Sequence, residues 1–170
     1  MTVFVALLRA VNVGGTGKLP METLRAMCAE LGFENVETYI ASGNVVLRSD
    51  RSADEVKTAL EDRLAEYAGK PVGVMIRTAE EIAQILKDNP FPDAPGNRVT
   101  ATFLDVPPPA DALDAMQGHA DEEAVAGRRE IYIHYPSGMG NSKLTIKAAK
   151  AGTARNLNTV AKLAEMAKDA

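Results

Sequence analysis

The sequence predicts an α+β fold, and two observations support this class. In residues 1–78, short apolar runs typical of strands alternate with two helical patterns in the order β-α-β-β-α-β. In residues 79–170, shorter strand and helix patterns are separated by turns rich in proline and glycine. Because 170 residues suffice for two small halves, we expect one domain over residues 1–78 and a second α/β domain with C-terminal helices over residues 79–170.

The elements of the first half follow from apolar spacing and capping residues. The apolar run 3–8 is typical of a buried strand, Pro20 opens a helix over 20–31, and Gly32 suits its left-handed end. Residues 36–40 and 45–47 form two strands, which the turn 41–44 joins as a hairpin. Ser52 and Glu55 form a capping box for the second helix, which ends at 69–71 before a fourth strand over 72–76.

This element order is that of a ferredoxin-like antiparallel sheet backed by two helices. In such a sheet the third strand lies between the first and the second and runs antiparallel to both. We therefore expect the run 3–8 in the middle of the sheet. The polar loop that follows it should lie beside the turn 41–44.

The second half is predicted from weaker patterns. Thr78 caps a helix over 79–87, a turn-rich link covers 89–96, a strand covers 99–104, and a short helix covers 110–116. Strands follow near 123–126 and over 130–135, where Tyr132 and His134 are expected to point outward. The final helical pattern begins in the segment 153–160 and has an apolar face that runs from Leu157 to Ala167.

The polar residues at the two adjoining loops form the candidate site. Glycine allows close backbone approach, while helix-start N–H groups and basic side chains attract an anion. We expect ligand contacts from these loops and from two polar segments of the second half: Arg9, Asn12, Gly14, Gly15, Lys18, Ser42, Gly43, Asn44, Lys143, Arg155 and Asn156. The alternative is a buried hydrogen-bond network in which Arg9 and Asn12 only tie the hairpin turn and the final helix together.

Composition narrows the classes of partner. The net charge of -4 disfavours broad nucleic-acid binding, and 46% hydrophobic with 25% charged residues is typical of a folded protein without membrane insertion. Cys28, the single cysteine, lies on the apolar face of the first helix, which predicts a buried thiol. The two histidines have no metal-site spacing, so no metal is expected, and the lack of a basic leader predicts a cytoplasmic protein.

Five motifs together carry a family resemblance. They are LLRAVNVGG at 7–15, YIASGNVV at 39–46, NPF at 89–91, NSKL at 141–144 and TARNLNTV at 153–160. With these motifs in this order, the chain resembles the bacterial domain of unknown function 1697 family over nearly its whole length. The resemblance implies a ferredoxin-like first half and a compact α/β second half. It implies no activity.

The predicted function is therefore binding of a phosphorylated small molecule or nucleotide at the glycine-rich strand-to-helix loop. The alternative is an RNA-binding or protein-interaction module without catalytic activity. RNA binding is disfavoured because the third strand lacks the aromatic residues on which bases stack. The sequence indicates no cofactor and no particular reaction, because the polar edge contains no general base. Asp105 and Glu130 could supply one, but the sequence does not place them at this edge.

Overall fold

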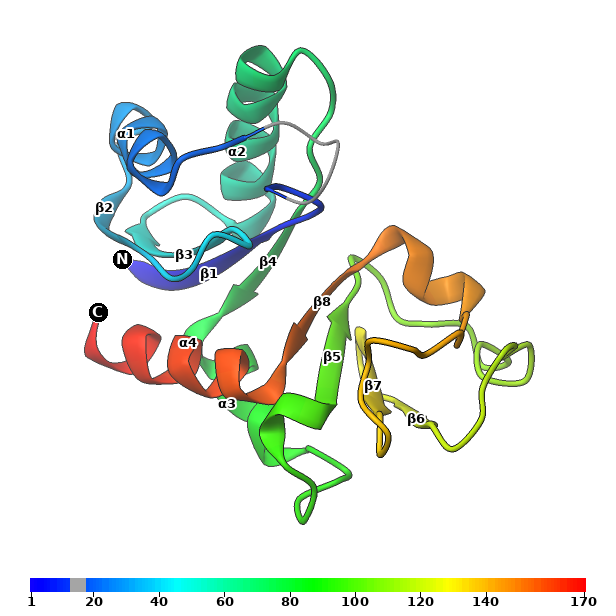
Figure 1. The fold of residues 1–170 in the computed structure, drawn as a ribbon. Helices are drawn as coiled ribbons and strands as arrows, with labels where there is room; N and C mark the ends of the chain where they lie inside the picture. Colours follow the sequence, from blue (N-terminus) through cyan, green and yellow to red (C-terminus); the bar gives the residue numbers. More distant parts are fainter. Residues whose placement is uncertain (13–17) are drawn as a thin grey trace. The chain divides into compact units, whose positions relative to one another are not determined.

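The computed structural model describes residues 1–12 and 18–170, so the predicted ligand residues Gly14 and Gly15 lie outside the described residues. The described chain forms two antiparallel four-stranded sheets with helices, which confirms the α+β class (Figure 1). It divides into two compact units. The first unit contains Met1–Ala83 and Lys162–Ala170, and the second contains Gln84–Ala161.

The sheet of the first unit has the strand order β2-β3-β1-β4, with antiparallel neighbours throughout. The strands are β1 (Thr2–Leu8), β2 (Glu34–Thr38), β3 (Asn44–Ser49) and β4 (Val74–Thr78). As predicted, β1 lies in the middle and β3 lies between β1 and β2. The predicted strand 36–40 ends earlier because Ile40 has a φ of 51° and belongs to the turn.

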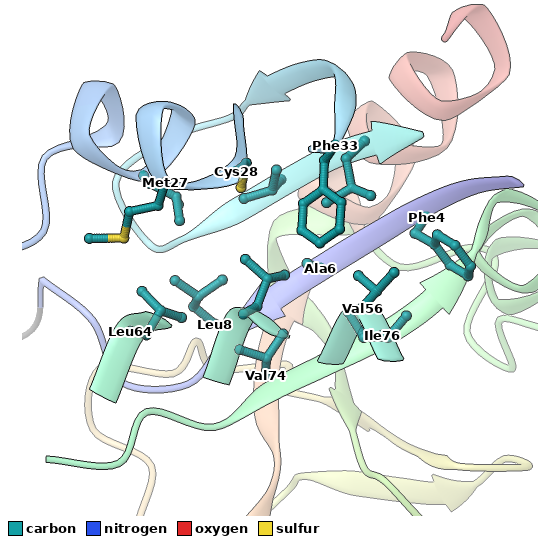
Figure 2. Packing of buried hydrophobic residues seen from close by; sticks show 14 of the residues in the cluster. Phe4, Ala6, Leu8, Met27, Cys28, Phe33, Val56, Leu64, Val74 and Ile76 are labelled. Atoms are coloured by element: carbon teal, nitrogen blue, oxygen red, sulfur yellow. The ribbon is translucent and has the colours of Figure 1, made fainter. Parts of the chain in front are cut away.

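Two helices bury their apolar faces on one side of this sheet. Helix α1 (Met21–Glu30) contributes Leu24, Met27 and Cys28, and helix α2 (Ala53–Ala68) contributes Val56, Leu60 and Leu64. Figure 2 shows Met27, Cys28, Val56 and Leu64 on the side of the sheet that carries Ala6 and Leu8 of β1. Each fully buried aliphatic side chain stabilises the fold by about 1.5–3 kcal/mol. The predicted buried thiol and the Ser52–Glu55 capping box are both confirmed.

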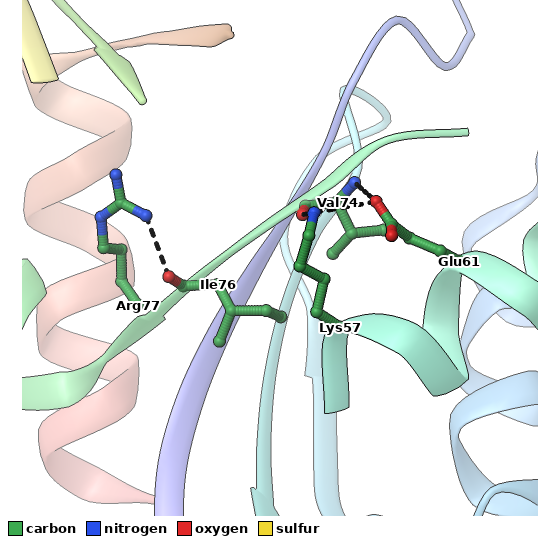
Figure 3. A network of polar contacts seen from close by, with 5 residues as sticks. All are labelled: Lys57, Glu61, Val74, Ile76 and Arg77. Atoms are coloured by element: carbon green, nitrogen blue, oxygen red, sulfur yellow. Dashed lines mark hydrogen bonds and ion pairs between the residues drawn. The ribbon is translucent and has the colours of Figure 1, made fainter. Parts of the chain in front are cut away.

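At the outer edge of β4, side chains bond to backbone groups that would otherwise be available to another strand (Figure 3). Lys57 Nζ of α2 donates to the carbonyl oxygen of Val74 at 2.6 Å, and Glu61 Oε2 accepts from the N–H of Val74 at 3.0 Å. Arg77 Nη1 donates to the carbonyl oxygen of Ile76 at 2.9 Å. Because these backbone groups point away from β1, the edge offers few bonds to an added strand.

The second unit has a sheet of order β6-β7-β5-β8, again antiparallel. Its strands are β5 (Val99–Phe103), β6 (Glu123–Ala126), β7 (Glu130–His134) and β8 (Thr153–Asn156), with two 3-10 helices, η1 (Gly96–Arg98) and η2 (Lys147–Ala151). Ile131, Ile133 and Leu104 pack with Ile146 in its core. Helices α3 (Ala79–Lys87) and α4 (Leu157–Asp169) each contribute residues to both units.

Two expectations for the second half are wrong, and one strand was not predicted. Residues 110–116 form successive turns with bonds such as Ala112 N to Pro109 O, because the three prolines before them start the chain in tight turns rather than in a helix. Tyr132 is buried and its hydroxyl donates to the carbonyl oxygen of Ile85 at 2.7 Å, so both faces of β7 are covered. Strand β8 was not anticipated within the segment 153–160, since it has only four residues.

In the described parts of the chain, none of the helices combines the length and the apolar character needed to cross a membrane.

Candidate functional site

A pocket of about 460 Å³ opens in the first unit, where β1 ends and β4 begins. Three segments line it, and their order in the chain explains why they meet. β1 leads into Arg9, Lys18 and Leu19 lead into α1, and the end of α2 leads through Lys70 into β4. The N–H of Arg9 donates to the carbonyl oxygen of Gly73 at 2.8 Å, which fixes the first segment against the third.

The polar part of this lining is basic. Arg9, Lys18 and Lys70 line the pocket, and none of its described lining residues is acidic. Within residues 1–12 and 18–170, neither Lys18 nor Lys70 forms an ion pair, and both are exposed. We refer to this cavity as the basic pocket. Its three positive charges can attract an anion of more than one negative charge.

Tyr67 forms one side of the basic pocket. Its side chain is 44% exposed, and its hydroxyl donates to the carbonyl oxygen of Lys18 at 3.3 Å. This bond connects the end of α2 to the segment that carries Lys18. The aromatic ring is therefore held at the pocket by its own helix and by the loop before α1.

Asn12 supports the pocket without lining it. Its Nδ2 donates to the carbonyl oxygens of Leu19 and Ala41, both at 2.8 Å, and its Oδ1 accepts from the N–H of Leu19 at 2.6 Å. A side-chain amide has two donor hydrogens, and backbone acceptors take both of them. Asn12 thus bonds to the hairpin turn through Ala41, as the alternative interpretation expects, and it also bonds to Leu19. Its expected link to the final helix stays a prediction.

The hairpin turn 41–44 lies beside Asn12, as predicted, and hydrogen bonds of Asn44 stabilise the turn. Asn44 is buried, and its Nδ2 donates to the carbonyl oxygen of Tyr39 at 2.8 Å and to Ser42 Oγ at 3.0 Å. Gly43 has a φ of 90°, and a Cβ there would lie 2.7 Å from Cγ2 of Val11. The turn therefore packs against Val11, one of the residues that line the basic pocket.

Two helix ends contribute opposing fields near the pocket. The C-terminal end of α2 carries roughly half a negative charge, of which the Gly69 N–H to Ala65 O bond satisfies one carbonyl. Lys18 and Leu19 directly precede α1, whose start at Pro20 has no side-chain cap within the described chain. Since the three basic side chains exceed the partial charge of α2, the field in the pocket favours an anion.

The other three candidate residues belong to the second unit. Arg155 on β8 is buried and donates from Nη1 to the carbonyl oxygen of Ala154 at 2.9 Å, and burial lowers its pKa to about 10. Asn156 caps α4, because its Oδ1 accepts from the N–H of Thr159 at 2.9 Å. Lys143 is exposed. Their placement relative to the basic pocket stays a prediction.

The segment 137–143, which has glycine, serine and lysine in common with phosphate loops, lies beside acidic side chains. Ser137 Oγ bonds to Asp121, and Ser142 Oγ donates to Glu122 Oε1 at 3.1 Å. The bond from the Ala120 N–H lowers the pKa of Glu122, which keeps this carboxyl negative. Two carboxylates thus bond to the serine hydroxyls of this segment. Among the described residues, no group of three or more His, Cys, Asp and Glu side chains is arranged to hold a metal.

Sequence reasoning missed Lys70 and Tyr67. The argument that placed the turn 41–44 beside the end of β1 applies equally to the fourth strand, because Leu8 pairs with Val74 and the residues before β4 must lie at the same edge. In the sequence, Gly69 and Pro71 mark the end of a helix, and nothing in this short pattern distinguishes Lys70 from an ordinary exposed lysine.

Comparisons with known proteins give a family and a fold. A family model described as a protein of unknown function (DUF1697) matches residues 1–132. The conserved bacterial protein SP0830 from Streptococcus pneumoniae has a similar solved structure, with a TM-score of 0.81, 25% sequence identity and coverage of 98% of each chain. Among curated proteins, none matches this sequence.

Proposed function

The chain belongs to the DUF1697 family of proteins of unknown function, and we propose that its first unit binds a phosphorylated small molecule in the basic pocket. The observation that supports this function is the lining of Arg9, Lys18 and Lys70 without an acidic residue among the described ones. A phosphomonoester carries about −1.5 to −2 charges at neutral pH, which suits such a lining.

Each basic residue has a separate part in this binding. Arg9 presents a planar guanidinium, which pairs with two phosphate oxygens at once, whereas Lys18 and Lys70 act as mobile point charges. The pocket volume of about 460 Å³ falls in the range of roughly 300–1,000 Å³ that holds small molecules. Asn12 and Gly43 would act indirectly, by holding Leu19 and Val11 in the lining.

Two observations disfavour the alternatives in the first unit. Bases stack on an exposed sheet face in RNA-binding modules of this topology, yet Val5, Leu7 and Met75 are buried on the face opposite α1 and α2. An added peptide strand needs a free edge, and at the β4 edge Lys57 and Glu61 occupy the carbonyl and the N–H of Val74 while Arg77 occupies the carbonyl of Ile76. Ligand binding at the basic pocket requires neither surface.

The test is a calorimetric titration of the whole protein with inorganic phosphate, ribose 5-phosphate and nucleoside monophosphates. We expect saturable binding by at least one of them, weakened about tenfold in Lys18→Gln and in Lys70→Gln, because a hydrogen bond to a charged group contributes about 1.5–3 kcal/mol. Lys147→Gln is the matched control, since it removes the same charge from an exposed site on η2. A flat response to all compounds, or equal losses in all three variants, would contradict the proposal.

A further inference from the structure

The floor of the basic pocket is apolar. Val11, Leu19 and Leu64 line the pocket and are 7%, 4% and 1% exposed, and all three belong to the hydrophobic core of the first unit. Val72 also lines it and packs against the same core. The pocket is therefore a basic rim above the edge of the core. A hydrophilic ligand would cover this floor without any gain from the hydrophobic effect.

The aromatic ring of Tyr67 adds a second apolar surface. Tyr67 is among the few large hydrophobic side chains that are exposed, and its hydroxyl is engaged with the carbonyl oxygen of Lys18. The ring is thus oriented before any ligand binds, so little rotational freedom would be lost on binding. A planar group of a ligand can stack on such a ring.

The volume of the basic pocket also favours a ligand with an apolar group. A phosphate group alone would occupy a small part of about 460 Å³ and leave the rest to water over apolar side chains. An aromatic or aliphatic group attached to the phosphate would displace that water and bury its own apolar surface against the floor and the ring of Tyr67. Each additional buried methylene would strengthen binding by about fourfold.

Resting on the function proposed above, we propose that the basic pocket selects organic phosphates that carry an aromatic or other apolar group. The phosphate contacts Arg9, Lys18 and Lys70 at the rim. The apolar group lies on Val11, Leu64 and Val72, and Tyr67 covers one side of it. Inorganic phosphate and polar sugar phosphates bind the same rim but leave the floor uncovered.

The experiment compares four probes in calorimetric titrations of the full chain: 1-naphthyl phosphate, ribose 5-phosphate, inorganic phosphate and 1-naphthol. We expect 1-naphthyl phosphate to bind at least about tenfold more tightly than ribose 5-phosphate, as burial of several ring carbons predicts. Tyr67→Ala should reduce this ratio to less than about threefold. Tyr67→Phe, which keeps the ring, should retain most of the ratio, and Lys70→Gln should weaken both phosphates alike.

The outcomes separate this inference from the proposed function. If ribose 5-phosphate binds as tightly as 1-naphthyl phosphate, the apolar selectivity is overturned and phosphate binding stands. If 1-naphthol binds as tightly as its phosphate and Lys70→Gln changes nothing, the rim has no role and both proposals fail. If Tyr67→Ala leaves the ratio unchanged, the ring is not part of the selection and the inference as stated is overturned.

Discussion

Asn12 and Leu19 bond to each other twice, with the Asn12 Oδ1 accepting from the N–H of Leu19 at 2.6 Å and the Asn12 Nδ2 donating to its carbonyl oxygen at 2.8 Å. One side chain thus occupies both backbone groups of a residue seven positions later. A third bond extends from Nδ2 to Ala41 in the hairpin turn. The geometry of the basic pocket depends on this amide, because Leu19 and the adjacent Lys18 both line it.

Replacement of Asn12 should therefore destabilise the protein, because Leu19 and Ala41 would lose their hydrogen bonds to its side chain. Asn12→Ala removes three bonds at a φ of 56°, a conformation that asparagine tolerates better than alanine because its polar side chain can bond to the nearby backbone. We expect a loss of about 2–4 kcal/mol in the free energy of unfolding, measured by urea denaturation. Asn12→Asp keeps the acceptor for the Leu19 N–H but places a carboxylate oxygen against the two carbonyl oxygens to which Nδ2 donates, so it should lose at least as much stability as Asn12→Ala. A clearly smaller loss in Asn12→Asp would contradict this role for the Nδ2 donor.

Gly43 and Gly32 provide a matched pair for the hairpin turn. Both have positive φ, 90° and 85°, but a Cβ at Gly32 would meet no atom within 4 Å, whereas at Gly43 it would lie 2.9 Å from Cβ of Leu8 and closer to Val11. Gly32→Ala should cost about 1–2 kcal/mol from backbone conformation alone. Gly43→Ala should cost about 1–3 kcal/mol more because of overpacking. The check is thermal unfolding of both variants, and similar melting temperatures would refute the close packing.

Cys28 makes a pH-dependent contribution to stability. Burial raises the pKa of its thiol from 9.0 to about 12, so the unfolded chain loses this proton at a lower pH than the folded chain. Folding is therefore disfavoured progressively as the pH rises from about 9 to 12, by up to about 1.4 kcal/mol per pH unit. Between about pH 8 and pH 10, the wild type should lose about 1.4 kcal/mol more than Cys28→Ala in chemical denaturation. If the free energy of unfolding falls equally with pH in both proteins, burial does not disfavour the thiolate of Cys28 in the folded state.

The part of the fold that could be predicted from the sequence is the part with strong local signals. Ser52 with Glu55, Thr78 as a helix cap and the run 3–8 each had one dominant physical interpretation, and each prediction is confirmed. The orientation of Tyr132 could not be obtained in this way, because alternation along a strand shows which residues share a face and not whether both faces are covered.

For the candidate site, the position of the loops could be predicted from the sequence, but the role of each side chain could not. Topology brought the loop after β1 to the turn 41–44, and the bond from Asn12 to Ala41 joins them. Residue type alone could not distinguish a ligand contact from a support, since an amide such as that of Asn12 or Asn44 serves either purpose. The distinction depends on which backbone groups lie within reach, and that is known only once the loops are folded.

Glu61 should stabilise the edge strand β4 through a single acceptor. Its Oε2 accepts from the N–H of Val74 at 3.0 Å and lies 2.9 Å from Lys57 Nζ, which itself donates to the carbonyl oxygen of Val74. Glu61→Ala would leave the Val74 N–H without this acceptor and Lys57 without this counter-charge. Because the Glu61 side chain is 32% exposed, solvent reduces the loss to about 1–2 kcal/mol. Glu61→Gln keeps an amide oxygen for the N–H and should recover most of the lost free energy of unfolding in urea denaturation, with little dependence on salt.

If Glu61→Gln is as destabilising as Glu61→Ala, the ion pair with Lys57 and not the bond to Val74 is responsible for the stabilisation. Added salt should then lower the stability of the wild type toward that of both variants.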